Sequence, residues 1–301
     1  MAITAASIKK ATKVSKKLRC LITGQTGSGK TGSSLLLAKG LTNNGKVLVL
    51  DTENGRASLK VDMPELQGFE YDVIEVSSQD VTSDDYIKAI ELAEQNGYDA
   101  VILDSATHEW EYVKELQQKL GGRYTDWGKA KAGHLRFVKK VISAKVHVII
   151  TARSDIKHEQ QEVNGRKQVV KLGLGTQQNS NFPYEMDFVF DIQDRAHNCV
   201  CDKSEGGLFT EPLFVITPQT GIVLAQYLSD GVDPETETKK KYAARIREIE
   251  GALLGAGLLT DTEIKAIEER DPTIFLSMAT DDLKTLGVSL GAKAKEAGLT
   301  V

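Results

Sequence analysis

The sequence predicts an α/β fold built on a mainly parallel sheet that helices cover on both faces. Short runs that are apolar throughout alternate with segments of helical spacing, which is typical of strands buried on both sides. A glycine-rich turn joins the first apolar run to the first helical segment. At 301 residues, the chain is long enough for one large core and a smaller appendage.

Composition narrows the class of protein. The hydrophobic and charged fractions, 41% and 27%, are those of an ordinary globular protein. No apolar run approaches the roughly 20 residues of a membrane span, and no signal-peptide pattern opens the chain, so we expect no membrane partner. The three cysteines form no disulfide framework, which predicts a cytoplasmic location. The net charge of −4 gives no sign of nucleic-acid binding, which must therefore come from local basic clusters.

We expect three regions along the chain. Residues 1–17 are polar and basic and are expected to form a solvated arm, or an amphipathic contact with a neighbouring subunit. Residues 18–230 are expected to form the core, which ends at a break of small and polar residues at 229–234. Residues 235–301 contain no strand candidate and are expected to form three or four short helices, with glycine caps at Gly255, Gly257 and Gly287.

A phosphate-binding motif follows the first strand candidate, residues 18–23. Residues 24–31 read Gly-Gln-Thr-Gly-Ser-Gly-Lys-Thr and fit G-x-x-x-x-G-K-[ST] between a strand and a helix. Glycines let backbone N–H groups turn inward around a phosphate, and the positive end of the following helix points to the same place. Lys30 would reach the β- and γ-phosphates, and the Thr31 hydroxyl would hold Mg²⁺.

We therefore expect this segment to bind a nucleoside triphosphate, ATP, with Mg²⁺. The alternative is a glycine-rich turn without a ligand. The expected binding residues are Gly24, Gln25, Thr26, Gly27, Ser28, Gly29, Lys30, Thr31 and Gly32.

Two further strand candidates end in acids. The strand at 100–103 is followed by Asp104, where a carboxylate would hold Mg²⁺ together with Thr31; the alternative is a helix cap. The strand at 46–50 leads to Asp51 and Glu53. We expect it to lie beside the P-loop strand, so that Glu53 emerges at the ligand-binding edge of the sheet. Glu53 could then act as general base toward a water molecule; the alternative is a solvated loop acid.

The rest of the core continues the alternation. Between residues 156 and 184 the alternation of strands and helices is replaced by a long polar stretch, which we expect to be a loop. Loops of this length are usually functional or disordered. The remaining candidates are strands at 69–76, 146–152, 186–192, 199–202 and 213–217, and helices at 83–96, 109–120 and 128–143.

The acidic strand ends resemble those of RecA-family ATPases. Val-Leu-Val-Leu-Asp-Thr-Glu, ending at Glu53, is similar to the family's strand ending in D-x-E, whose glutamate activates water. Val-Ile-Leu-Asp-Ser, containing Asp104, resembles the family's Walker B segment. The resemblance covers roughly residues 18–228 and implies a RecA-like P-loop NTPase core, ATP hydrolysis at subunit interfaces, and a homo-oligomeric ring or filament. The family's γ-phosphate sensor is a glutamine, which is absent here, so Thr151 or Arg153 would take its place.

Within this family the chain is similar to the compact phage RecA-like ATPases of the Sak group, which assist single-strand annealing and recombination. The shared segments are residues 104–110, Trp127, the strand at 147–153, and residues 184–187. This resemblance implies single-stranded DNA as a partner, a single-strand DNA-binding protein as a further partner, and the host cytoplasm as location.

The family resemblance also implies two DNA-binding loops near the subunit axis. Around 121–131 cations alternate with aromatic residues, the composition that neutralises phosphates and stacks bases. The other loop, around 155–181, is basic. The alternatives are solvated loops and, for Trp127, a core anchor. The candidate residues are Arg123, Tyr124, Trp127, Lys129 and Lys131 in the first loop, and Lys157, His158, Arg166, Lys167 and Lys171 in the second.

A second lysine is implied by the family resemblance. Members carry paired lysines on a hairpin that reaches the neighbour's ATP, and only Lys203 stands at this place here. The alternative is an exposed turn lysine. Cys199 and Cys201 follow His197 closely, but no second ligand pair lies nearby, so we expect core cysteines and no metal site beyond Mg²⁺.

The sequence therefore predicts an ATP-dependent recombination or annealing protein that binds single-stranded DNA. A hexameric helicase or motor shares this core but normally brings an N-terminal domain, and fewer than twenty residues precede the first strand here. A nucleotide-dependent switch that binds a protein is the other alternative. A small-molecule kinase is disfavoured, because no arginine-rich lid follows the core.

Overall fold

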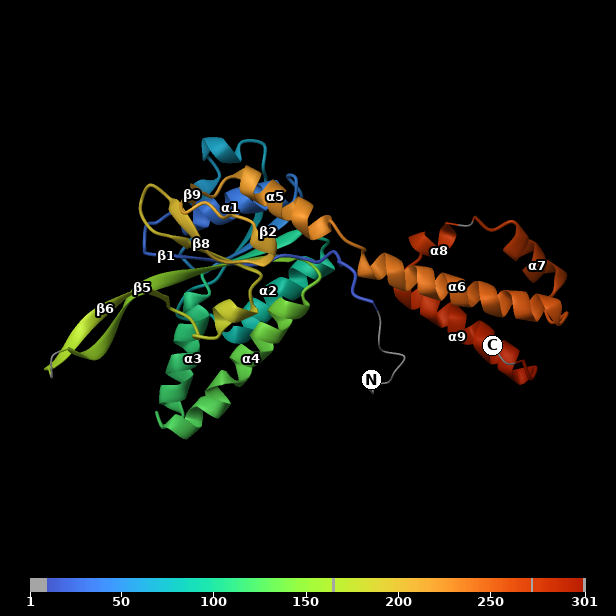
Figure 1. Cartoon of the computed structure of the whole chain (residues 1–301). Helices are drawn as coiled ribbons and strands as arrows, with labels where there is room; N and C mark the ends of the chain where they lie inside the picture. The colour runs from blue at the N-terminus through green and yellow to red at the C-terminus, as the bar shows by residue number, and fades with distance from the viewer. Residues whose placement is uncertain (1–9, 164–165, 272, 300–301) are drawn as a thin grey trace. The chain divides into compact units, whose positions relative to one another are not determined.

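The computed structural model describes residues 10–163, 166–271 and 273–299 (Figure 1). Residues 17–228 form one compact unit, and the rest of the described chain forms a second. Each unit is described by itself below.

A central sheet organises the larger unit. Within the described residues nine strands join in the order β3-β2-β4-β5-β1-β7-β8-β9, and β6 pairs with β5. The six strands from β3 to β7 along this order are parallel, whereas β6, β8 and β9 are antiparallel to their neighbours. The strands are β1 (Arg19–Gly24), β2 (Val47–Asp51), β3 (Asp72–Glu75), β4 (Ala100–Asp104), β5 (His147–Val163), β6 (Arg166–Thr176), β7 (Phe188–Ile192), β8 (Asn198–Ser204) and β9 (Phe214–Val215).

Helices cover both faces of this sheet (Figure 1). Alternate residues of β1 point to opposite faces of the sheet. Cys20 and Ile22 pack in the core under α1 and α5, whereas Leu21 packs with α2 and α4. Because both faces are buried, the central strands are apolar throughout, as expected. This arrangement confirms the predicted fold class. The helices are α1 (Lys30–Leu41), α2 (Ser83–Gln95), α3 (Thr107–Lys119), α4 (Trp127–Ser143) and α5 (Pro218–Ser229).

The predicted position of the strand at 46–50 is wrong. β1 pairs with β5 on one side and with β7 on the other, so β4 and β5 separate β2 from the P-loop strand. The order along a parallel sheet depends on crossover connections, which strand composition does not specify. The carboxyl ends still meet at one edge, because Asp51 of β2 lies in register with Asp104 of β4.

The predicted loop at 156–184 is also wrong over most of its length. β5 continues beyond the sheet to Val163 and pairs with antiparallel β6, with Ser154 opposite Thr176, so that the two strands form a ribbon extending away from the sheet (Figure 1). An Asn-Gly pair at positions 164–165 separates the two strands in the sequence and is the strongest short-range hairpin signal. The polar composition of this stretch masked that signal.

The smaller unit is helical, but two of its helices are longer than predicted. Helix α6 has 22 residues and α9 has 17. Gly287 lies inside α9 and is not a cap; a β-carbon there would lie 3.7 Å from Ile246, so α9 packs closely on α6 at this point. The helices are α6 (Pro234–Gly255), α7 (Asp261–Glu268), α8 (Ile274–Ser277) and α9 (Thr280–Glu296).

Residues 10–16 belong to the smaller unit. Val14 forms a β-bridge with Val232, and Lys13 pairs with Asp230 at 3.0 Å. The apolar cores of this unit lie between α6, α8 and α9 and contain Ile246, Phe275 and Leu283, and Ile249, Leu253 and Ala294. Among the residues that the structure describes, no helix combines the length and apolar character needed to cross a membrane.

His147 makes the stability of the larger unit depend on pH. Its Nδ1 accepts the Leu18 N–H at 2.9 Å, and burial, with the charges of Lys17 and Arg19, lowers its pKa from 6.5 to about 3. The unfolded chain takes up a proton near pH 6.5, whereas the folded unit does not until about pH 3. The stabilisation is therefore complete above pH 6.5 and is lost as the pH falls toward 3.

Replacing His147 should flatten this pH dependence. In urea unfolding between pH 6.5 and 4, the free energy of unfolding of the wild type should fall more steeply than that of His147→Gln, by up to about 1.4 kcal/mol per pH unit. Equal slopes would contradict a neutral, buried His147.

Candidate nucleotide-binding and hydrolysis site

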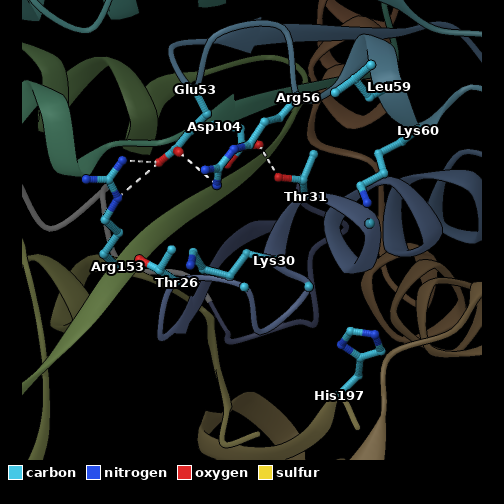
Figure 2. A pocket seen from close by; sticks show the side chains of 13 residues that line it. Thr26, Lys30, Thr31, Glu53, Arg56, Leu59, Lys60, Asp104, Arg153 and His197 are labelled. Carbon is cyan, nitrogen blue, oxygen red and sulfur yellow. Dashed lines mark hydrogen bonds and ion pairs between the residues drawn. The ribbon is translucent and has the colours of Figure 1, made fainter. Parts of the chain in front are cut away.

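A pocket of about 380 Å³ lies at the carboxyl edge of the parallel sheet. Its walls come from the P-loop, the turn after β2, the end of β4, Arg153 within β5, and the turn between β7 and β8 (Figure 2). Its lining includes Lys30, Thr31, Glu53, Asp104, Arg153 and His197.

The P-loop backbone favours glycine at Gly27 and Gly29. Gly27 and Gly29 have φ values of 81° and 94°, in the left-handed region that favours glycine. A β-carbon at Gly29 would also overlap the His197 imidazole, which hydrogen-bonds through Nδ1 to Ser28 O at 2.7 Å. His197 was expected only as a neighbour of the cysteines, and no local sequence signal reveals its contact with the P-loop. Cys199 is buried in the core and Cys201 is half-buried.

Lys30 is buried at the base of the pocket. Its Nζ donates to Gly24 O and Gln25 O, at 3.0 Å each. Burial lowers the pKa of Lys30, while Asp104 and Glu53 act in the opposite direction. The Ser28 hydroxyl is also buried and has no hydrogen-bond partner among the described residues. The loop thus gathers an ammonium group, a hydroxyl and backbone N–H groups, which suits a phosphate chain.

The Asp104 carboxylate joins three elements. Thr31 Oγ1 at the start of α1 donates to Asp104 Oδ2 at 2.6 Å, and Thr151 Oγ1 of β5 donates to Asp104 Oδ1. Asp104 is only 1% exposed, and burial raises its pKa, which the two hydroxyl groups oppose. Hydroxyl and carboxylate oxygens are the ligands that Mg²⁺ prefers, so the donor set fits this ion, and Thr31 and Asp104 would hold it.

Glu53 faces the pocket from the turn after β2. Its Oε1 accepts from Arg153 Nη2 at 2.7 Å and Nε at 3.1 Å, and its Oε2 pairs with Arg56 Nη1 at 3.1 Å (Figure 2). The Asp51 carboxylate fixes the turn by accepting the N–H groups of Glu53 and Ala57, at 2.7 Å each. Arg56 was missed from the sequence; a basic residue three positions after Glu53 is a weak signal that only the turn geometry makes meaningful.

The structure thus brings together most of the predicted hydrolytic residues. Lys30, Thr31, Glu53, Asp104 and Arg153 line one pocket although they come from four separate segments. Lys203 is not among its lining residues: it lies on β8, and its Nζ donates to Tyr184 O at 2.8 Å. A role for Lys203 would therefore concern a neighbouring subunit.

The first predicted DNA-binding segment joins α3 to α4 through a 3-10 turn at Tyr124–Asp126. Trp127 stacks on Trp110 with ring centroids 5.8 Å apart, and the Lys131 ammonium lies 5.1 and 5.5 Å from the two rings. Both tryptophans are half-buried, whereas Tyr124 is 90% exposed, and Arg123 and Lys129 are exposed. The exposed groups that could meet a nucleic acid are therefore Arg123, Tyr124 and Lys129.

The second predicted segment lies on the β5–β6 hairpin. In its backbone register Lys157 is opposite Gly173, His158 is opposite Lys171, and Lys167 is opposite Glu162. The side chains of the candidates lie outside the described residues; these candidates are Lys157, His158, Arg166, Lys167 and Lys171.

A family profile described as an AAA domain matches residues 16–215. The match covers more than half of the chain and contains the P-loop, Glu53, Asp104 and Arg153. The chain therefore belongs to this family of AAA domains. Together with the sheet and the P-loop, the match identifies the larger unit as an AAA-type P-loop domain with an α/β fold.

Two solved structures show similarity to the chain. One is the RadB recombinase, at 17% identity over 69% of this chain and 90% of that chain, with a TM-score of 0.40. The other is an ATPase from the type III secretion system of pathogenic bacteria, at 15% identity over 92% of this chain and 79% of that chain, with a TM-score of 0.38. No curated protein sequence matches the chain.

The Asp104→Asn substitution should weaken Mg²⁺-dependent nucleotide binding. The amide keeps the size of the side chain but removes the charge that would hold the cation. We expect the Mg²⁺ concentration needed for binding of a non-hydrolysable ATP analogue to rise at least about tenfold, the lower end of what even indirect changes cost at metal sites. Asp191→Asn is the control, since Asp191 is a buried carboxylate on β7 that holds Thr23 at 2.6 Å. The same Mg²⁺ dependence in Asp104→Asn and wild type would contradict the assignment.

Proposed function

We propose that this ATPase domain hydrolyses ATP within a homo-oligomer that acts on single-stranded DNA, in the manner of the phage RecA-like annealing and recombination ATPases of the Sak group. The observation that carries the hydrolytic part is the convergence of Lys30, Thr31, Asp104 and Glu53 on one pocket. A P-loop alone would bind nucleotide; the buried acid beside it adds a group that can take a proton from water.

The proposed roles follow from the positions of the side chains. The P-loop N–H groups and Lys30 would hold the phosphates, and Thr31 and Asp104 would hold Mg²⁺, which would neutralise phosphate charge when bound. Glu53 accepts a proton from the water whose oxygen attacks the γ-phosphorus. The bond from the γ-phosphorus to the bridging oxygen breaks, and ADP leaves with the electron pair.

A neighbouring subunit would complete the site. Lys203 lies away from the pocket of its own chain, at the end of a strand near an edge of the sheet. In a ring or filament its ammonium would reach the neighbour's ATP and stabilise the charge that develops in the transition state.

DNA binding is proposed for the α3–α4 connection and the β5–β6 hairpin. Tyr124 offers an exposed ring for base stacking, and Arg123 and Lys129 offer exposed cations for phosphates. The Trp127 ring, at the start of α4, stacks on Trp110 of α3. The hairpin adds further basic positions in the sequence.

The test is ATP hydrolysis by the purified chain with and without single-stranded DNA across a salt series. We expect DNA to stimulate hydrolysis and the effect to fade as salt rises, because phosphate contacts release counterions. Hydrolysis indifferent to DNA, with no DNA binding at low salt, would contradict the proposal and favour an ATPase that acts on a protein.

Two lysines on one helix sharpen the test. Lys129 lies at the end of α4 that is proposed to contact DNA. Lys139 is an exposed residue nearer the other end of the same helix. Lys129→Ala should reduce the slope of log affinity against log salt by about one, whereas Lys139→Ala should leave it unchanged. Equal slopes for the two variants would remove the α3–α4 connection from the DNA-binding surface.

A further inference from the structure

A chain of polar side chains leads away from Glu53. Arg153 Nη2, which donates to Glu53 Oε1 at 2.7 Å, also lies 3.1 Å from His108 Nε2. On the other side of the ring, His108 Nδ1 lies 2.7 Å from Thr52 Oγ1. His108 comes from the first turn of α3. This series of polar side chains therefore connects α3 with the pocket and with the turn after β2. Neither His108 nor Thr52 has a role in the function described above.

The partners of His108 fix its ring. Burial, and then the charge of Arg153, lower its pKa, which keeps the imidazole neutral. Arginine can only donate, so Nε2 is the acceptor and Nδ1 carries the hydrogen that faces Thr52 Oγ1. Since both ring nitrogens have partners and the side chain is buried, His108 holds the guanidinium in one orientation.

Arg153 is better placed than Thr151 to meet a γ-phosphate. The Thr151 hydroxyl is fully buried and is used by Asp104, whereas Arg153 lines the pocket with a side chain that is 31% exposed. The backbone of Arg153 is anchored, because its N–H donates to Thr107 Oγ1 at 2.8 Å and its carbonyl accepts from Gln177 at 2.7 Å. Only the side chain can therefore change partner.

Glu53 has both carboxylate oxygens occupied in this arrangement. Arg153 takes Oε1 and Arg56 takes Oε2. Because Oε1 accepts two N–H groups of the Arg153 guanidinium, both of its lone pairs are used and a water molecule cannot donate to it. A γ-phosphate carries more negative charge than a single carboxylate and matches the guanidinium geometry equally well.

We propose that Arg153 distinguishes ATP from ADP by exchanging Glu53 for the γ-phosphate, and that His108 is the positioning residue for this exchange. This rests on the proposed hydrolytic function of the pocket. With ADP or without nucleotide, Arg153 keeps Glu53 paired. With ATP, the guanidinium turns to the γ-phosphate and frees Oε1 for the attacking water.

The direct test is the affinity ratio between a non-hydrolysable ATP analogue and ADP, both with Mg²⁺, measured by calorimetry. Arg153→Ala should lower the preference for the triphosphate at least tenfold and change ADP affinity less than threefold. Arg136→Ala is the matched control, because Arg136 forms an exposed ion pair with Asp84 on the same unit. Its ratio should equal that of the wild type.

Two amide variants test His108. The oxygen of a glutamine can reach the position of Nε2 and accept from Arg153, whereas an asparagine reaches only the position of Nδ1. His108→Gln should therefore keep the wild-type affinity ratio, and His108→Asn should lower it at least threefold, although both replace the imidazole. A purely structural role would not separate the two variants in this order.

The outcomes separate this inference from the proposed function. A wild-type chain that binds analogue and ADP equally, or an Arg153→Ala variant with an unchanged ratio, overturns the role of Arg153 while hydrolysis at Glu53 still stands. Equal ratios in His108→Gln and His108→Asn overturn the role of His108. A wild-type chain that binds neither nucleotide overturns the proposed function and this inference together.

Discussion

The two hydroxyl groups that donate to Asp104 are the interaction on which the site depends. Thr31 brings the first turn of α1, and therefore the P-loop, to the end of β4, and Thr151 brings β5 to the same carboxylate. Parallel strands make this possible, because their carboxyl ends meet at one edge of the sheet. The in-register neighbour of Asp104 is Asp51, whose carboxylate shapes the turn that carries Glu53.

Two buried carboxylates of the larger unit each have several polar partners. Glu53 is paired with two arginines. Glu109 of α3 is fully buried and contacts His134 of α4 at 3.0 Å, Ser83 of α2 at 2.7 Å and Gln178, beyond β6, at 3.3 Å. Removing one partner of such a group leaves an uncompensated charge, which typically costs about 3–5 kcal/mol. The cluster thus ties three helices to the base of the β5–β6 hairpin.

The parts of the site that the sequence could predict are those whose residues lie close together in the sequence or at recognisable strand ends. The P-loop is a continuous motif whose glycines and Lys30 act through the backbone around them, so its residues were recognised directly. Asp104 ends an apolar strand and Glu53 follows two residues after another. The shared edge of a parallel sheet places both near the P-loop even though the predicted position of β2 was wrong. Arg56 and His197 enter the pocket through turns whose paths depend on tertiary packing, and the contact of His108 with Arg153 spans 45 positions of the chain. The hairpin was predictable from its Asn-Gly pair, but the polar stretch around that pair favoured a loop.

The most direct measurement of the central claim is the turnover of ATP by Glu53→Gln. The amide keeps the shape of the side chain and can still accept from Arg153, but it cannot take a proton from water. We expect turnover to fall at least about 100-fold, as for loss of a general base, with ATP affinity unchanged. The exposed Glu70→Gln serves as the control and should keep wild-type turnover. Wild-type turnover by Glu53→Gln would contradict the account and remove Glu53 from the chemistry.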